Sequence, residues 1–265
     1  MTVASSGLIT SVFVSHGAPT LLLEAGPTQT FLTELGRTLP RPRAILCVSA
    51  HWDTPAPRIT GNPAPATIHD FYGFPDALYE VRYPSPGEPQ LAEQVAVLLR
   101  GVGLDAAIDP SRGLDHGAWV PLHFMYPQAD IPVVQLSLQS HLDPQHHLSI
   151  GRALQALRAD RILIIGSGGA THNLGEFGVH TVDAPAQGYA QAFDNWLEDA
   201  VLHARSDTLL DYVQEGPSAR RNHPTAEHFL PLFVPMGAAS ADTRGRRLHA
   251  GFTYGVLSMA AYAWD

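Results

Sequence analysis

Three runs of apolar, mostly β-branched residues stand out in the pattern of hydrophobic and polar positions along the chain. They are Val12-Phe13-Val14, Ile45-Leu46-Cys47-Val48 and Ile162-Leu163-Ile164-Ile165. Each run is short, has no polar residue inside it, and is followed by small or turn-forming residues. Such runs are typical of strands that are buried on both faces of a sheet. The pattern therefore predicts strands near residues 8–14, 43–49 and 161–166.

The remaining segments alternate between helical and extended patterns. We expect helices near residues 28–38, 89–101, 144–158 and 185–203. Further strands are expected near residues 104–109 and 131–138, and a pair of segments completes the C-terminus. Strands that alternate with helices favour an α/β fold, in which a central, mostly parallel or mixed sheet is flanked by helices. The Pro-rich stretch from Thr54 to Pro89 predicts a long loop, and loops of that length in compact proteins are usually functional or disordered.

Length and composition narrow the class of protein. The chain has 265 residues, of which 45% are hydrophobic and 15% are charged, so a sizeable core is expected in a single domain spanning residues 1–265. The formal net charge of −9 argues against nucleic-acid binding, which needs clustered Lys and Arg. The short basic run Arg244-Gly245-Arg246-Arg247 is interpreted as a solvated loop.

The sequence also bears on membranes and on the compartment. No stretch of about 18 uncharged apolar residues occurs, so we expect no membrane span. The single cysteine, Cys47, excludes an intramolecular disulfide and is expected to be a buried small hydrophobe. This cysteine usage is typical of a reducing compartment, and the protein is expected to be cytoplasmic.

Four histidines stand beside small or turn-forming residues: His16, His51, His172 and His228. The first three follow the three predicted buried strands. Because the carboxyl ends of parallel strands form the ligand crevice of an open α/β sheet, these side chains are expected to converge there. Neutral imidazole is a common metal ligand, so the pattern predicts a metal site. Three histidines and a water also form a catalytic zinc site, so a zinc-dependent hydrolase remains an alternative.

The other histidines differ in their surroundings. His69 and His223 lie in segments rich in proline or aromatic residues and are candidates for lining the site. The rest are expected at the surface or in capping positions: His123, His141, His146, His147, His180, His203 and His249. The glycine-rich stretch 166–171 has no complete phosphate-binding motif, and we interpret it as a sharp turn that brings His172 into the crevice.

Seven motifs occur in order from about residue 12 to residue 260. They are Ser15-His16-Gly17, Ser49-Ala50-His51-Trp52, Thr67-Ile68-His69-Asp70-Phe71, Gly73-Phe74-Pro75, Leu114-Asp115-His116-Gly117-Ala118-Trp119, Thr171-His172-Asn173-Leu174 and His223-Pro224-Thr225-Ala226-Glu227-His228-Phe229-Leu230-Pro231-Leu232. Together they resemble the DOPA-dioxygenase branch of the class III (LigB-type) extradiol ring-cleaving dioxygenases. The resemblance implies a LigB-like fold and a non-haem metal enzyme that opens the ring of a small catechol with O₂.

The resemblance also implies roles for particular residues. His16, His51 and His228 match the positions that hold the metal, which is Fe(II) in the active enzyme, and Zn(II) is expected to occupy the site after purification in air. His172 matches a position that serves either as the acid/base or as a fourth ligand. His116, in a stretch interpreted as turn-like with Asp115 beside it, matches a histidine that faces the oxygen and the substrate.

Two points stay open within this resemblance. The usual facial site has two histidines and one carboxylate, so Glu227 or Asp53 is an alternative to His228 as the third ligand. A non-catalytic LigB-like binding module is an alternative to an enzyme.

The expected surroundings of the metal follow from the same motifs. The predicted walls around the substrate ring are formed by Trp52, His69, Phe71, Phe74, Trp119 and His223. The expected partners are a small-molecule catechol and O₂, and the sequence leaves open whether the chain forms a homo-oligomer.

Overall fold

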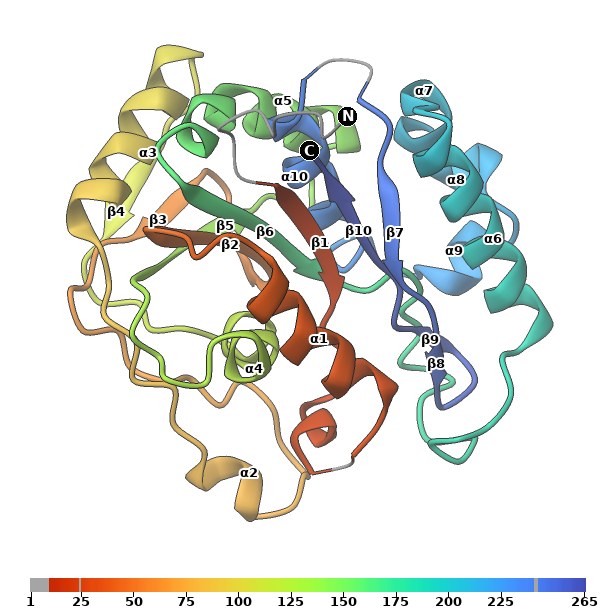
Figure 1. Ribbon diagram of the computed structural model, residues 1–265. Coiled ribbons are helices and arrows are strands. Elements are labelled where there is room, and N and C mark those ends of the chain that lie inside the picture. The colour runs from red at the N-terminus through yellow and green to blue at the C-terminus, as the bar shows by residue number, and fades with distance from the viewer. Residues whose placement is uncertain (1–9, 24, 241–242) are drawn as a thin grey trace, which may run out of the picture.

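The centre of the protein is an eight-stranded mixed sheet, seen in the computed structural model, which describes residues 10–23, 25–240 and 243–265 (Figure 1). Its strand order is β4-β3-β5-β2-β6-β1-β10-β7. The strands are β1 (Ser11–Ser15), β2 (Ala44–Asp53), β3 (Arg58–Thr60), β4 (Ala107–Asp109), β5 (Val133–Leu138), β6 (Ile162–Gly168), β7 (Arg246–His249) and β10 (Ala261–Trp264). A separate two-stranded sheet pairs β8 (Phe252–Thr253) with β9 (Leu257–Ser258).

The three strands predicted from the apolar runs lie next to one another in this sheet. β2, β6 and β1 pair in parallel, and β5 continues the parallel arrangement on the far side of β2. All three are fully buried over their apolar runs, as the absence of alternation predicts. The predicted α/β fold with a mostly parallel, mixed sheet is therefore confirmed. Residues 8 and 9 of the first predicted strand lie outside the described residues.

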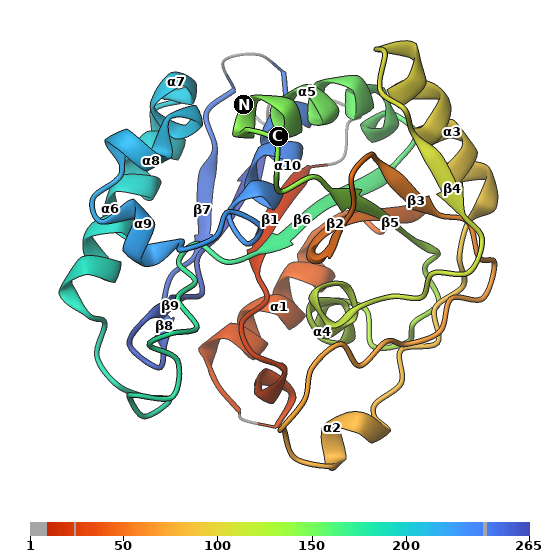
Figure 2. The same cartoon turned by 180° about the vertical axis from the view of Figure 1, so that it is seen from behind.

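Helices cover both faces of the sheet (Figures 1 and 2). Alternate strand side chains pack on α1 (Pro27–Thr38) and α4 (His116–Met125) on one face. On the opposite face they pack on α3 (Pro89–Gly101), α5 (Pro144–Leu154) and α10 (Phe233–Ala238). Successive strand residues point to opposite faces, so each buried strand supplies both cores.

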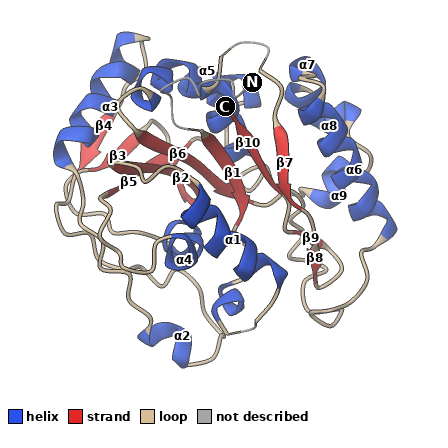
Figure 3. Ribbon diagram, in the orientation of Figure 1, coloured by secondary structure: helices blue, strands red, loops and turns tan. Residues whose placement is uncertain are grey.

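A third group of helices lies beside β7 (Figure 3). It consists of α6 (Gly188–Leu202), α7 (Ser206–Leu210), α8 (Tyr212–Glu215) and α9 (Ala219–Asn222). The short helix α2 (Ala77–Glu80) stands apart, and the described residues also form three 3₁₀ turns: η1 (Pro19–Leu22), η2 (Gln155–Arg158) and η3 (Leu230–Leu232). The four predicted helices are present, although the third ends as α5 followed by η2.

Several local predictions were wrong. The stretch expected to be one long loop contains β3 and α2. The stretch around His116 is not a turn but the start of α4, whose N-cap is Asp115. Eight of the ten residues of α4 are buried, so its sequence shows no polar face from which a helix could be recognised. The short helices α7 to α10 were also not predicted, and the C-terminal pair of segments is four short strands.

Two polar side chains are less exposed than the sequence predicted. Arg247, placed by the sequence in a solvated loop, lies in β7 and pairs with Asp194 and Glu198 at 2.6 Å each. His147, expected at the surface, is fully buried. Its Nδ1 lies 3.0 Å from the carbonyl oxygen of Asp143, and its Nε2 accepts from the backbone N–H of Gln139. Among the described residues, no helix is long and apolar enough to cross a membrane.

Candidate metal centre

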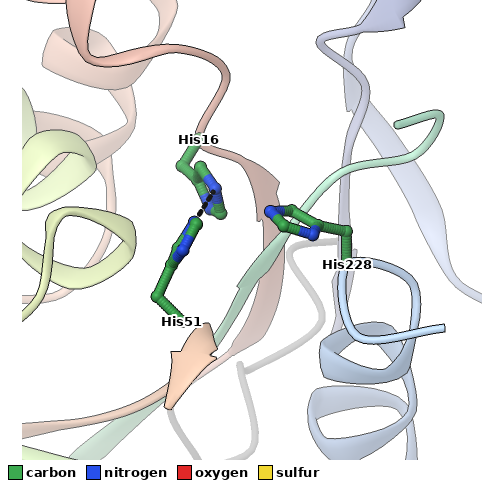
Figure 4. A group of neighbouring side chains, drawn as sticks. All are labelled: His16, His51 and His228. Atoms are coloured by element: carbon green, nitrogen blue, oxygen red, sulfur yellow. Dashed lines mark hydrogen bonds between the residues drawn. The ribbon is translucent and has the colours of Figure 1, made fainter. Parts of the chain in front are cut away.

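Three histidines from distant segments converge at the carboxyl end of the parallel strands. His16 follows β1 directly, His51 lies near the end of β2, and His228 precedes η3. One ring nitrogen of each lies within 4.8 Å of the others. Figure 4 shows the three rings pointing toward one another, and the Nε2 atoms of His16 and His51 are 3.0 Å apart. The structure thus brings together the three histidines that the sequence singled out as metal ligands.

Neighbouring polar groups fix which ring nitrogen of each histidine carries the proton. The hydroxyl of Ser167 donates to the carbonyl oxygen of Gly117, so it accepts from the Nδ1–H of His16 at 3.0 Å. The carboxylate of Glu227 accepts from the Nδ1–H of His228 at 3.0 Å. The carboxylate of Asp70 lies 3.5 Å from Nδ1 of His51 and favours the same tautomer.

This tautomer leaves an unprotonated Nε2 on each of the three rings. Two lone pairs that face each other across 3.0 Å repel unless a cation lies between them. Nε2 of His228 is buried and has no hydrogen-bond partner in the described part of the chain. Two nitrogens bound at about 2.1 Å and at right angles are about 3.0 Å apart, which agrees with the His16–His51 separation. The donor set therefore fits a divalent metal ion.

Burial keeps these rings neutral. Burial, with the charges of neighbouring histidines second, lowers the pKa of His16 and of His228 well below the ordinary value. Burial and the charge of His116 lower the pKa of His51 to about 3. All three imidazoles are thus neutral at neutral pH, the state in which they bind metals.

Two further histidines flank this group. The ring of His116 lies 3.9 Å from that of His51, between ring centroids. The ring of His172 stacks on that of His228 at 3.4 Å, with 7° between the planes. Burial lowers the pKa of His172 to about 4. The five rings together are called the histidine cluster below: His16, His51, His116, His172 and His228.

Asp70 is a site residue that sequence reasoning missed. Its carboxylate accepts from Nδ1 of His116 at 3.0 Å and from the backbone N–H of the same residue at 2.9 Å. Burial by itself raises the pKa of Asp70, but the hydrogen bonds and charges of His116 and the charge of His51 outweigh it and lower the pKa to about 2. Asp115, the neighbour of His116 in sequence, bonds Ser49 and Gln135 and does not bond the imidazole of His116 among the described residues. The only sequence signal for Asp70 was its place in the motif Thr67–Phe71.

Four of the predicted wall residues lie against the cluster or against one another: Phe71, Phe74, His69 and Trp119. The ring of Phe71 is 5.6 Å from that of His116, edge to face. His69 packs on Phe71 at 5.8 Å and on Trp119 at 5.6 Å. The indole N–H of Trp119 donates to the backbone oxygen of Ile68 at 2.8 Å, which joins the predicted loop to α4.

Other predicted site residues lie elsewhere. Trp52 points away from His51, its neighbour on the strand, and packs under the guanidinium of Arg112 at 5.2 Å. His223 is 4% exposed, and its ring contacts Phe193, Tyr212 and Phe229. In the part of the chain that the structure describes, neither ring contacts a ring of the histidine cluster.

The two carboxylates weighed as alternative ligands also differ in position. Asp53 accepts from the backbone N–H of Ser140 at 2.9 Å and belongs to no candidate metal group among the described residues. Glu227 groups with His172 and His228, and it holds the outer nitrogen of His228.

Comparison with known proteins identifies the family. A family model described as the catalytic LigB subunit of aromatic ring-opening dioxygenase matches residues 11–264. The chain belongs to the LigB family. It is an extradiol ring-cleaving dioxygenase and hence an oxidoreductase, as the motifs predicted. The family implies a catechol-type substrate and O₂, and the histidine cluster is its candidate site for a non-haem metal.

Relatives of this LigB protein match over nearly its whole length. The chain is 42% identical over 254 residues to a 4,5-DOPA dioxygenase extradiol of Beta vulgaris, covering 94% of each chain. It is 39% identical over 261 residues to a 4,5-DOPA dioxygenase extradiol of Escherichia coli K12, covering 97% of this chain and 95% of that one. A crystal structure of an uncharacterized E. coli K12 protein superposes with a TM-score of 0.80 at 34% identity, covering 97% and 100% of the two chains.

Proposed function

We propose that this protein opens the aromatic ring of a DOPA-like catechol with O₂, using Fe(II) held by His16, His51 and His228. The observation that carries the proposal is the convergence of three neutral imidazoles whose Nε2 atoms all lack a proton. Ser167, Asp70 and Glu227 hold the outer nitrogens of these rings. Such partners orient metal-binding histidines and raise their basicity. The relatives named 4,5-DOPA dioxygenase extradiol favour a DOPA-like catechol over other aromatic compounds.

Fe(II) bound by His16, His51 and His228 would bring the catechol and O₂ together and would pass electron density between them. His172 accepts a catechol hydroxyl proton, because its imidazole stays neutral at neutral pH and lies directly against His228. His172 as a fourth ligand is the competing role, and the variants described in the Discussion separate the two.

His116 serves as a second proton-transfer group on the other side of the cluster. Its Nδ1–H donates to Asp70, so Nε2 carries the free lone pair. Nε2 can therefore accept a proton and later return it to the substrate. When Nε2 is protonated, the Asp70 carboxylate stabilises the resulting cation. This arrangement of a base oriented by a carboxylate recurs in enzymes that move protons during catalysis.

The aromatic ring of the catechol packs against the side chain of Phe71, which is next to His116. His69 packs on Phe71 and on Trp119 and supports this wall. The proposed substrate wall does not include Trp52, whose ring packs on Arg112, or His223, whose ring is buried among aromatic side chains. A cytoplasmic, reducing compartment is part of the proposal, since it matches both the single buried cysteine and a metal ion that must stay ferrous.

The test is oxygen uptake by anaerobically iron-loaded protein with a panel of catechols that includes DOPA, dopamine and protocatechuate. We expect one O₂ consumed per catechol and the absorbance of a muconic semialdehyde product, with DOPA among the preferred substrates. His16→Ala, prepared in the same way, is the control for uncatalysed oxidation by free iron.

Two outcomes would replace the proposal. Hydrolysis of esters or amides by zinc-loaded protein, without oxygen uptake in the iron form, would establish the zinc hydrolase. Catechol binding without turnover in either metal form would establish the binding module. The family to which the chain belongs favours neither.

A further inference from the structure

The segment that carries His172 into the histidine cluster is held at every residue. Beyond β6 the chain runs through Gly169, Ala170 and Thr171. The N–H of Gly169 donates to the carbonyl oxygen of His228 at 2.8 Å, and that of Ala170 donates to the Ser15 hydroxyl at 3.0 Å. The hydroxyl of Thr171 donates to the carbonyl oxygen of Val256 at 2.8 Å. The position of His172 is therefore fixed by its surroundings rather than by its own side-chain bonds.

Three consecutive residues at the end of α9 supply further bonds to this segment. The backbone oxygen of Asn222 accepts from the N–H of His172 at 2.9 Å. The backbone oxygen of Arg221 accepts from the side-chain amide of Asn173 at 2.7 Å. The imidazole of His223 bonds the backbone oxygen of Ala170 through Nε2 at 3.0 Å. Residues 221–228 thus both hold the His172 segment and carry His228.

The bond from His223 has a defined direction. A carbonyl oxygen only accepts, so Nε2 of His223 carries the proton and donates it to Ala170. The other ring nitrogen, Nδ1, is buried and has no hydrogen-bond partner within the described chain. Burial lowers the pKa of His223 to about 3, so the ring is neutral. A polar ring in this apolar surrounding carries a desolvation cost, and its one described hydrogen bond goes to the segment that carries His172.

We propose that His223 is a positioning residue for His172. Its bond to Ala170 fixes the turn two residues before His172, and so sets the ring of His172 parallel to that of His228 at 3.4 Å. A shift of about 1 Å in a reacting group can cost on the order of a hundredfold in rate, so loss of this bond lowers turnover without touching the substrate. The inference rests on the proposed role of His172 in proton transfer.

The test compares three substitutions of different reach. In His223→Gln the side-chain amide nitrogen can occupy the place of Nε2 and keep the donor. In His223→Asn the amide reaches only as far as Nδ1, and His223→Leu has no donor. We expect kcat within about threefold of wild type for the Gln variant, and a loss of about tenfold or more for the other two. KM for the catechol should stay within about twofold, and the metal content should be equal in all of them.

A second measurement does not depend on activity. The imidazole ¹⁵N and ¹H resonances of His172, assigned with His172→Gln, are recorded in metal-free protein. They should move in the Asn and Leu variants and stay in place in the Gln variant. Leu99→Ala, which opens a cavity in the buried face of α3, is the control for general destabilisation and should leave kcat and these resonances unchanged well below its melting temperature.

Distinct results would overturn the inference. Wild-type kcat and unmoved His172 resonances in the Asn and Leu variants would show that the bond does not position His172. A raised KM at unchanged kcat would show that His223 contacts the substrate. If the wild-type protein cleaves no catechol, the proposed function fails, whereas the resonance shifts still decide whether His223 holds His172.

Discussion

Asp70→Asn is the most informative single substitution in this protein. The carboxylate holds Nδ1 of His116 at 3.0 Å and lies 3.5 Å from Nδ1 of His51. Asparagine has nearly the same shape and can still accept from the backbone N–H of His116, so the fold and the start of α4 should survive. What disappears is the negative charge that sets both tautomers and stabilises His116 when Nε2 takes up a proton.

The size of the effect follows from the hydrogen bond between Asp70 and His116, and the pKa of Asp70 gives its direction. The partners of the carboxylate lower that pKa to about 2, against an ordinary value of 3.8. The hydrogen bond from the Nδ1–H of His116 to this carboxylate is charge-assisted, and such bonds are worth about 1.5–3 kcal/mol. Asp70 is partly exposed, so screening by solvent places its bond near the lower end of that range, at about 2 kcal/mol. If this interaction acts in the transition state, kcat falls by a factor of about 30.

The assay is ring-cleavage kinetics on samples matched for iron content. We expect the drop in kcat with KM for the catechol nearly unchanged. Asp76→Asn, an exposed carboxylate six residues away in the same loop, is the matched control and should behave as wild type. Adding His116→Phe to Asp70→Asn completes a double-mutant cycle.

Two results would refute this reasoning. If Asp70→Asn lowers kcat as much in the His116→Phe background as in wild type, Asp70 does not act through His116. If the substitution mainly lowers metal content, its contact with His51 is the important one.

Four further predictions concern the metal, the cluster and pH. Elemental analysis of the purified protein should find one divalent metal ion per chain. After purification in air this ion should be zinc and not iron, because nitrogen ligands bind Zn²⁺ more tightly than Fe²⁺. A protein that binds no metal under any loading condition would contradict the assignment of the metal site. His16→Ala and His51→Ala should lose metal and activity together, whereas His172→Ala should lose turnover more than metal; equal metal loss in all three would make His172 a ligand. His116→Phe should keep metal and bind catechol but lose at least about tenfold in kcat, and an unchanged rate would show a purely structural role. Burial lowers the pKa of His147 to about 4, whereas in the unfolded chain this pKa is about 6.5. The unfolded chain therefore binds more protons at His147 between these pH values, and the free energy of unfolding should fall by about 3 kcal/mol as the pH drops from 6.5 to 4. In urea unfolding of metal-loaded protein, His147→Leu should show a weaker dependence of this free energy on pH, and an equal dependence would contradict the prediction.

The sequence by itself determined the central sheet and the histidines at its carboxyl edge. Uninterrupted apolar runs specify strands buried on both faces, and β2, β6 and β1 are those strands. Because neighbouring parallel strands have their carboxyl ends at the same edge of the sheet, His16, His51 and His172 are expected near one another regardless of how the connecting loops fold. The ordered motifs supplied the family, and with it His116 and the expected metal-binding role of His228. These features are local in sequence or follow from the sheet, so no tertiary detail was needed.

Only the tertiary structure decided which atoms of those residues face the site. Ser167 lies 151 residues from His16, and Asp70 lies 46 residues from His116, so no spacing rule connects each pair. Their hydrogen bonds arise when separate loops pack at one edge, and these bonds select the ring nitrogen that is free to bind. The same packing buried α4 on nearly all sides, and it left His223 against Ala170 rather than against the substrate site. A local pattern reports how a segment can fold, whereas the orientation of a side chain depends on partners that the fold brings to it from elsewhere.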